Sequence, residues 1–136
     1  MREIKFRGKR TDNGEWVEGY LTRRPSAIQY EAHYSPWFID VPPKDPDDSG
    51  GLYNVDPATV GEYTGLADKN GTEIFEGDIV FDTIDRENDL IIFERGAFCI
   101  INSHTILRLG RTLSTQIKVI GNIHDNPELM EREAEE

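Results

Sequence analysis

The chain has 136 residues, 37% of them apolar, and this suits one domain with a modest core. Its apolar runs are short and broken by charge, which excludes a helix that crosses a bilayer. Net charge is −11: residues 1–24 carry seven basic and four acidic residues, net +3, and the remainder carries eight basic and twenty-two acidic residues, net −14. Such an acidic body disfavours general binding to a phosphate backbone.

The first predicted element is a strand over Glu3–Arg10, in which apolar and basic residues alternate. One side carries Ile4, Phe6 and Gly8, and the other carries Lys5, Arg7 and Lys9. This pattern predicts a half-buried strand with its apolar side inward and its basic side outward. Asn13-Gly14 favours a tight hairpin turn, and Glu15–Thr22 is the predicted return strand.

The next segment, Arg23–Thr59, differs in composition because it holds six of the seven prolines. VPPKDPDDSGG, residues 41–51, has the composition of an exposed loop with an acidic tip. The aromatic stretches AIQYEAHY and PWFIDV could form short strands at the edges. We therefore predict a long irregular insertion over residues 23–59, a length that is often either disordered or functional.

The rest of the chain predicts a helical turn capped by Asp56, then a series of short strands, then an acidic C-terminal tail. The predicted strands are Glu62–Leu66, Thr72–Phe75, Ile79–Thr83, Leu90–Phe93, Ala97–Ile101 and Gln116–Ile123. A short helix is expected to begin at Asn126-Pro127, within the tail at 127–136. Strands with turns about every ten residues are typical of an all-β barrel or sandwich.

The acidic stretch YTGLADKNGTEIFEGDIV, residues 63–80, has three interpretations. A calcium loop of the EF-hand type fails because Gly71 falls at the fourth position from Asp68 rather than the sixth. Glu76 and Asp78 could be an acid/base pair, but such a pair needs a cleft that a sequence does not show. Asp-Lys-Asn-Gly as a turn between two strands explains every residue type, and we prefer it.

No other pattern predicts chemistry. The three histidines lack zinc spacing, and the single cysteine, Cys99, can neither form an internal disulfide nor complete a structural zinc site. Nucleotide-binding glycine motifs and the G-x-S-x-G pattern do not occur. We predict a chain without catalytic activity, metal or cofactor, and the Glu76/Asp78 pair is the one enzyme alternative.

Three segments together resemble the YopX family of bacteriophage and prophage proteins: REIKFRGKR…GEWVEGYL, YTGLADKNGTEIFEGDIV and VIGNIHDNPEL. Their order and spacing cover nearly the whole chain as a single YopX-like domain over residues 1–136. The resemblance implies a mostly β fold, in part similar to an SH3-like barrel, and a product of the bacterial cytoplasm. It implies backbone turns at Gly65, Gly71, Gly77 and Gly121, and packing by Leu66, Ile74, Ile79 and Val80.

The leading functional hypothesis is a non-enzymatic module that binds a protein partner or a second copy of itself. Its predicted contact residues are Tyr34, Trp37 and Phe38, because exposed aromatic side chains anchor interfaces. A second hypothesis is binding of nucleic acid by the basic residues Lys5, Arg7, Lys9, Arg10, Arg23 and Arg24. A third is that the acidic body imitates nucleic acid and inhibits a DNA-binding enzyme.

Overall fold

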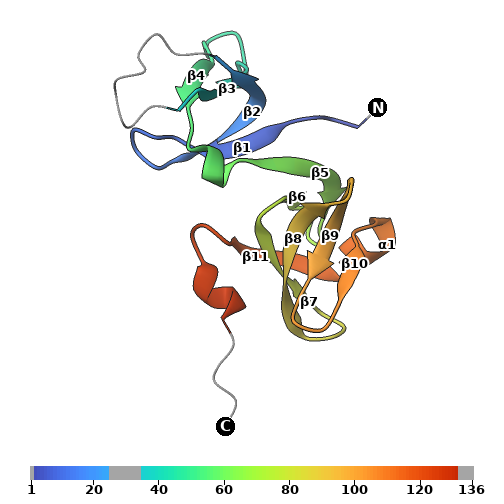
Figure 1. Ribbon diagram of the computed structural model, residues 1–136. Helices are drawn as coiled ribbons and strands as arrows, with labels where there is room; N and C mark the ends of the chain where they lie inside the picture. The colour runs from blue at the N-terminus through green and yellow to red at the C-terminus, as the bar shows by residue number, and fades with distance from the viewer. Residues whose placement is uncertain (1, 25–34, 132–136) are drawn as a thin grey trace. The chain divides into compact units, whose positions relative to one another are not determined.

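The computed structural model describes residues 2–24 and 35–131 (Figure 1). They form two compact units, Met1–Tyr63 and Thr64–Glu136. The single domain predicted over residues 1–136 stays a prediction. Each unit has its own buried apolar residues: Ile39 and Val55 in the first, and Ile74 and Ile91 among those of the second. Mainly β structure, as predicted, is confirmed: two antiparallel sheets and little helix.

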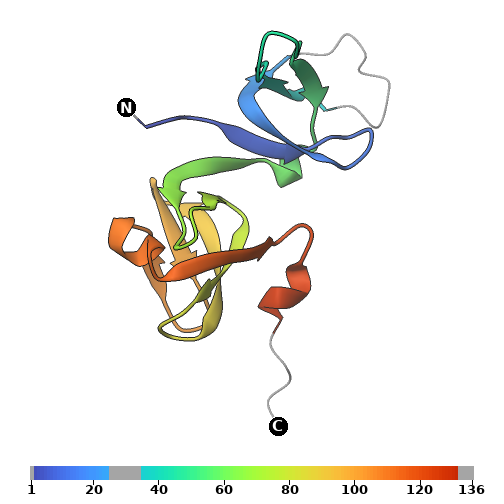
Figure 2. The same cartoon turned by 180° about the vertical axis from the view of Figure 1, so that it is seen from behind.

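The first unit is built from four strands and the beginning of a fifth. They are β1 (Phe6–Lys9), β2 (Trp16–Arg23), β3 (Trp37–Val41), β4 (Gly51–Asn54) and, after the 3-10 turn η1 (Pro57–Thr59), β5 (Gly61–Ala67). The sheet has the order β4-β3-β2-β1-β5-β6, and the order of its first four strands can be followed in Figure 2. The predicted first hairpin, with its turn before Glu15, is confirmed as β1 and β2.

Closure of a barrel is the part of the predicted fold that is wrong. One isolated bridge joins Arg10, after β1, to Val55, after β4, and Thr11 N donates to Asn54 O at 3.0 Å. The ladder does not continue beyond that bridge, and in the described residues both sheets have two free ends in their strand orders. A barrel needs a full staggered ladder between its first and last strands, which one bridge does not supply.

The insertion predicted to be irregular contains regular structure in its described part. Residues 35–59 contribute β3, β4 and η1, and β3 pairs with β2 on one side and with β4 on the other. Prolines misled the prediction, because Pro42 and Pro43 follow the paired residues of β3 and interrupt no ladder bond. Within the described residues of the insertion, the loop interpretation of residues 41–51 holds for the segment between β3 and β4.

The core of the first unit forms where β1 meets β3 and the residues on either side of η1. Gly8 is buried, and a Cβ there would lie 3.2–3.3 Å from Val55, Val60 and Ile39, so no larger residue fits without a shift. The predicted cap of η1 is confirmed: Asp56 Oδ1 accepts a hydrogen bond from Ala58 N at 3.0 Å.

Replacing Gly19 with alanine is expected to destabilise the first unit, because the added Cβ would overlap the main-chain carbonyl of Asp40 on β3. Separating two paired strands should cost about 1–3 kcal/mol, the usual range for overpacking. Gly110→Ala is the matched control, since its Cβ would meet nothing within 4 Å. Urea denaturation followed by tryptophan fluorescence reports on this unit, which holds both Trp16 and Trp37. Equal midpoints for the two variants would contradict the expected clash.

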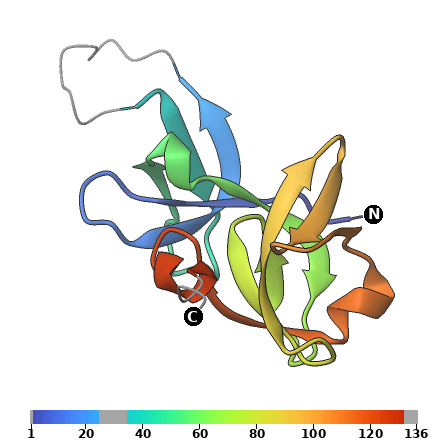
Figure 3. The same cartoon turned by 60° about the horizontal axis from the view of Figure 1, so that its bottom comes forward.

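The second unit contains the end of β5 and a five-stranded antiparallel sheet. Its further elements are β6 (Glu73–Phe75), β7 (Asp78–Asp82), β8 (Glu87–Glu94), β9 (Ala97–Ile101), β10 (Ile106–Arg108), α1 (Arg111–Ser114), β11 (Ile117–Asn122) and the 3-10 turn η2 (Pro127–Met130). The strand order of the five-stranded sheet is β10-β9-β8-β7-β11. Figure 3 shows the two hairpins that β7, β8 and β9 form in sequence.

The core of the second unit confirms the packing roles that the family resemblance implied. Ile74, Ile79 and Val80 are fully buried. Ile74 and Val80 belong to one apolar cluster, and Leu66 packs against it. The remaining members of this cluster are Ile91, Ile100, Leu109 and Ile117. Strands on either side of β8 therefore depend on one apolar layer.

The predicted glycine turns and the predicted C-terminal helix differ in detail from the structure. Gly71 and Gly77 lie at turns and have positive φ angles, as the resemblance implied. Gly65 also has a positive φ angle but lies inside β5, and Gly121 lies at a register shift between β7 and β11, so the turns implied at these two positions are not present. The helix predicted after Asn126 is the 3-10 turn η2, and the remainder of the predicted tail lies outside the described residues. None of the helices in the described part has the length and apolarity needed to cross a membrane.

Candidate functional site

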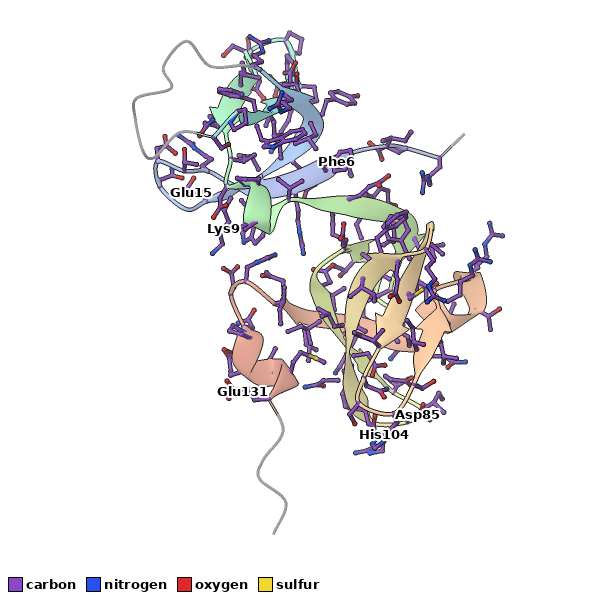
Figure 4. The ribbon with its side chains drawn as sticks, viewed as in Figure 1. Phe6, Lys9, Glu15, Asp85, His104 and Glu131 are labelled. Atoms are coloured by element: carbon purple, nitrogen blue, oxygen red, sulfur yellow. The ribbon has the colours of Figure 1, made fainter. Side chains whose placement is uncertain are left out.

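The cations of β1, and Lys5 just before it, lie over aromatic rings. Lys5 Nζ is 5.0 Å from the centre of the Tyr63 ring, and Lys9 Nζ is 5.5 Å from the Trp16 ring centre. The Arg7 guanidinium carbon also lies over Trp16, 4.9 Å from the ring centre, so two cations lie over one indole ring. This arrangement follows from the alternation of β1 and from the register that pairs Lys9 with Trp16. Figure 4 marks the two ends of β1 with Phe6 and Lys9.

The prediction that this strand is apolar inward and basic outward is therefore wrong in its detail. Ile4 is exposed, and Lys5, Arg7 and Lys9 are all half-buried. Long basic side chains cover apolar surface with their methylene stems, and an aromatic ring provides such a surface. Alternation in the sequence identified the two sides of the strand but did not show that rings cover the basic one.

Carboxylates compete for the same cations. Lys5 Nζ lies 3.7 Å from Glu3 and 3.9 Å from Glu18, yet the Lys5 side chain is 17% exposed while those of Glu3 and Glu18 are 64% and 50% exposed. Arg10 donates from Nε and Nη2 to both oxygens of Asp12, at 2.9 and 2.7 Å. These bonds raise the pKa of Arg10 and lower the pKa of Asp12. The charges that face solvent here are thus largely negative.

Arg23 and Arg24, the other two cations of the nucleic-acid hypothesis, are exposed at the far end of β2. The guanidinium of Arg23 lies 6.0 Å from the centre of the Trp37 ring. The six predicted cations therefore do not form one exposed patch, because those on β1 and at Arg10 are partly covered and only the last two face solvent.

An exposed row of one aromatic, one acidic and one aliphatic side chain crosses β2, β3 and β4 in the first unit. The registers Tyr20–Asp40 and Asp40–Leu52 place these three side chains in one row on one face of the sheet. Tyr20 is 59% exposed and Leu52 is 40% exposed. The sequence analysis did not predict Tyr20 or Leu52 as contacts of a protein partner, and the signal available for Tyr20 was the two-residue period of β2.

Of the three aromatic residues predicted to contact a partner, Phe38 lies nearest in register to this row. Phe38 is half-buried and shares the face of Asp40, because the two are separated by one residue on β3. Trp37 is also half-buried but points to the opposite face of the strand. Tyr34 lies outside the described residues. The structure thus places Trp37 and Phe38 on different faces.

A groove adjoins the N-terminal part of β2. Its volume is about 640 Å³, and its lining includes the rings of Trp16, Tyr20 and Tyr53 together with Pro42 and Pro43. The size falls within the usual range of ligand and peptide pockets. Glu15, labelled in Figure 4, is exposed at the end of the first hairpin and also lines it.

The acidic stretch of the second unit uses Asp68 to hold backbone. Its Oδ1 accepts hydrogen bonds from Asn70 N and Thr72 N at 2.8 and 2.9 Å, and its Oδ2 accepts one from Val119 N at 2.8 Å. Asp68 is buried, so these three bonds offset the cost of removing its charge from water. The turn interpretation of Asp-Lys-Asn-Gly is confirmed, with the addition that Asp68 also joins the turn to β11.

Asp78, a member of the alternative acid/base pair, has a similar structural use. It is buried, and its Oδ2 accepts a hydrogen bond from Phe75 N at 2.7 Å across the β6–β7 turn. A carboxylate that accepts a hydrogen bond from a nearby backbone amide in this way stabilises the turn. Glu76, the other member, is half-buried at the same turn.

The buried carboxyl group of Asp89 has a pKa that is displaced upward. Burial is the main cause, and the nearby carboxylates of Asp82, Glu87 and Asp85 add to it. Asn102 Nδ2 donates to Asp89 Oδ1 at 2.8 Å and opposes the shift.

This raised pKa predicts a pH dependence. The folded chain binds the Asp89 proton more tightly than the unfolded chain, so the contribution to stability is present below the ordinary pKa of 3.8 and is lost as pH rises through the folded value. Asp89→Asn cannot titrate, so its stability relative to the native chain should increase between pH 3.5 and pH 7. Urea midpoints at both pH values measure this, with exposed Asp47→Asn in the first unit as the control, because Asp47 is not among the groups that shift Asp89. An unchanged difference between the two pH values would contradict the assignment.

These features define the class of protein: a small, mostly β chain in which no exposed constellation of catalytic groups stands out among the described residues. The model of the YopX family, described as YopX protein, matches residues 5–131, and the chain belongs to this family. The resemblance found in the sequence is thereby confirmed.

One solved structure is similar over nearly the whole length. It is the crystal structure of protein EF1440 from Enterococcus faecalis, with 27% sequence identity and a TM-score of 0.61. The similarity covers 96% of this chain and 100% of the other. A comparison with curated proteins gives no match. Neither the family description nor the relative's name specifies a reaction or ligand, so function has to be argued from the surface.

Proposed function

We propose that this chain is a small non-enzymatic module that binds a protein partner, encoded by a phage or prophage and acting in the cytoplasm of the bacterial host. The phage origin and compartment rest on membership of the YopX family. The observation that carries the interaction role is the exposed row of Tyr20, Asp40 and Leu52 across three strands of one unit. Aromatic and aliphatic residues presented on a rigid sheet are typical anchors of protein interfaces.

The nucleic-acid alternative has weaker support. Phosphate binding needs cations that reach solvent, and Lys5 and Arg10 are 17% and 23% exposed beside more exposed carboxylates. The acidic-mimic alternative is weakened too, since several acidic residues of the second unit are buried. Those residues are Asp68, Asp78, Asp82 and Asp89. Buried carboxylates cannot imitate a row of phosphates on the surface.

A capture experiment tests the proposal. The tagged full chain is incubated with bacterial host lysate, with and without nuclease, and retained proteins are identified by mass spectrometry. A Tyr20→Ala/Leu52→Ala variant should lose a protein that the native chain retains after nuclease treatment. Ile84→Ala is the control, because it removes an equally exposed apolar side chain from the second unit. Loss of all partners on nuclease treatment would refute the proposal in favour of nucleic-acid binding. Retention of the same partners by both variants would show that the exposed row does not contact the partner.

A further inference from the structure

The groove of the first unit lies where β3 stops covering β2. Cross-strand pairing between β2 and β3 begins at Tyr20, opposite Asp40, so the ladder does not extend to Glu18. On the other side of the groove the chain continues from Val41 into Pro42 and Pro43, which have no N–H to donate and cannot lengthen the ladder. The N-terminal part of β2 is therefore an edge that this segment flanks without pairing to it.

The hydrogen-bond pattern of the first hairpin gives the direction of the peptide groups on that edge. Arg10 N donates to Glu15 O at 2.9 Å, and Gly8 is opposite Val17. Because hydrogen-bonded and non-hydrogen-bonded pairs alternate in an antiparallel ladder, Glu15 and Val17 direct their peptide groups toward β1. The N–H and C=O of Glu18 consequently face the groove. They are the groups that an added strand would use.

The side chains around this edge are suited to an extended segment. The rings of Tyr20 and Tyr53, with Pro42 beside them, line the groove as apolar walls. An extended peptide offers its side chains alternately to two sides, so every second one would meet these walls while its backbone meets Glu18. Addition of a strand to an open edge is an established way in which sheets bind peptides.

Charge selects the kind of peptide. The carboxylates of Glu3 and Glu18 are 64% and 50% exposed, and Glu15 is exposed as well. Two of the cations in the lining are covered: Lys5 is 17% exposed, and Arg10 is held by Asp12 and lies 4.4 Å from the centre of the Tyr53 ring. The exposed Lys44 is followed closely by the aspartates at 45, 47 and 48. A partner at the rim therefore meets mainly negative charge.

We propose that this groove binds an extended basic segment of a partner protein, which pairs with the edge of β2 at Glu18 as an added strand. The inference rests on the proposed interaction role and names the chemistry of the partner: lysine or arginine alternating with apolar residues. Basic side chains of the segment meet the rim carboxylates, and apolar ones meet the tyrosine and proline walls.

Titration of the isotope-labelled full chain with a synthetic peptide tests this inference. The probe is a ten-residue peptide of alternating lysine and valine, and its counterpart carries glutamate in place of lysine. We expect the lysine peptide to shift the amide signal of Glu18 and the indole signal of Trp16, and to slow hydrogen exchange at the Glu18 amide. The glutamate peptide should leave both signals in place.

A matched pair of double variants distinguishes the effect of the rim carboxylates on binding from a general effect of net charge. Glu15→Gln/Glu18→Gln should weaken binding of the lysine peptide by about two- to tenfold, the range expected for two exposed ion pairs. Glu87→Gln/Glu94→Gln changes the net charge equally in the second unit and should leave the dissociation constant unchanged. Because the first pair is exposed, neither substitution is expected to unfold the chain.

Three results would overturn the inference: no binding at millimolar peptide, shifts that map away from β2, or equal weakening by both double variants. Shifts of the Glu18 and Trp16 signals by a single-stranded oligonucleotide, with no shift by either peptide, would also overturn it and assign the groove to nucleic acid. A failed titration together with a captured protein that depends on Tyr20 and Leu52 would refute the basic-peptide groove while leaving the proposed function standing.

Discussion

Replacing Ile91 with alanine is expected to lower the free energy of unfolding of the second unit by about 2–5 kcal/mol. Ile91 is fully buried on β8, which pairs with β7 on one side and β9 on the other. Its side chain belongs to the apolar cluster that includes Ile74 and Ile100. Truncation removes buried methylene and methyl groups and leaves a cavity that paired strands on both sides cannot easily close.

Circular dichroism during urea denaturation is the suitable measurement. Both tryptophans and all five tyrosines precede residue 64, so aromatic fluorescence would report on the first unit instead. Ile84→Ala provides the control: Ile84 is 67% exposed in the β7–β8 turn, and its loss should change stability by no more than about 0.5 kcal/mol. Similar midpoints for the two variants would show that Ile91 is not packed as described.

Replacing Asp68 with alanine is expected to lower the free energy of unfolding of the second unit by about 2–4 kcal/mol. The change removes three charge-assisted hydrogen bonds, each of which usually contributes about 1.5–3 kcal/mol, although water can replace part of those at the turn. The bond to Val119 N matters most, because it joins residues 51 positions apart in the chain. Without it, the N–H of Val119 loses this acceptor.

Lys69→Ala is the matched control, since it alters an exposed side chain of the same turn. Asp68→Asn should recover part of the stability by keeping one oxygen for the turn while its amide group cannot accept from Val119. Hydrogen exchange at the Val119 amide distinguishes this link from a general loss of stability: it should accelerate in both Asp68 variants and remain slow in Lys69→Ala. A slow Val119 amide in Asp68→Ala would argue against the bond.

The strands and turns that depend on neighbouring residues were predictable. Ala97–Ile101 has the bounds expected from its apolar run, because a short apolar segment between turn residues has few other ways to bury itself. The cap at Asp56 and the turn glycine at Gly71 also follow from local chemistry, since their backbone partners or φ angles lie within a few residues. The family match depends on the same locally determined segments.

The site residues were less predictable. The prediction treated Lys5 and Arg7 as exposed cations, and the aromatic residues near residue 37 as one contact patch. The ring that covers Lys5 belongs to Tyr63, far along the chain, so no local pattern could show the contact. Likewise, the exposed pair of Tyr20 and Leu52 becomes a row only through the pairing of β2, β3 and β4.

The amino-acid sequence by itself determined the mostly β class, the positions of most turns and membership of the YopX family, because alternation and turn chemistry act over a few residues. Only the tertiary structure decided that the described residues form two units with separate cores, that the sheets stay open, and that Asp68 supports β11. It also decided which charges reach solvent. These properties depend on contacts between segments that are distant in the sequence. Such long-range packing and hydrogen-bond pairing leave no periodic signal in a single sequence.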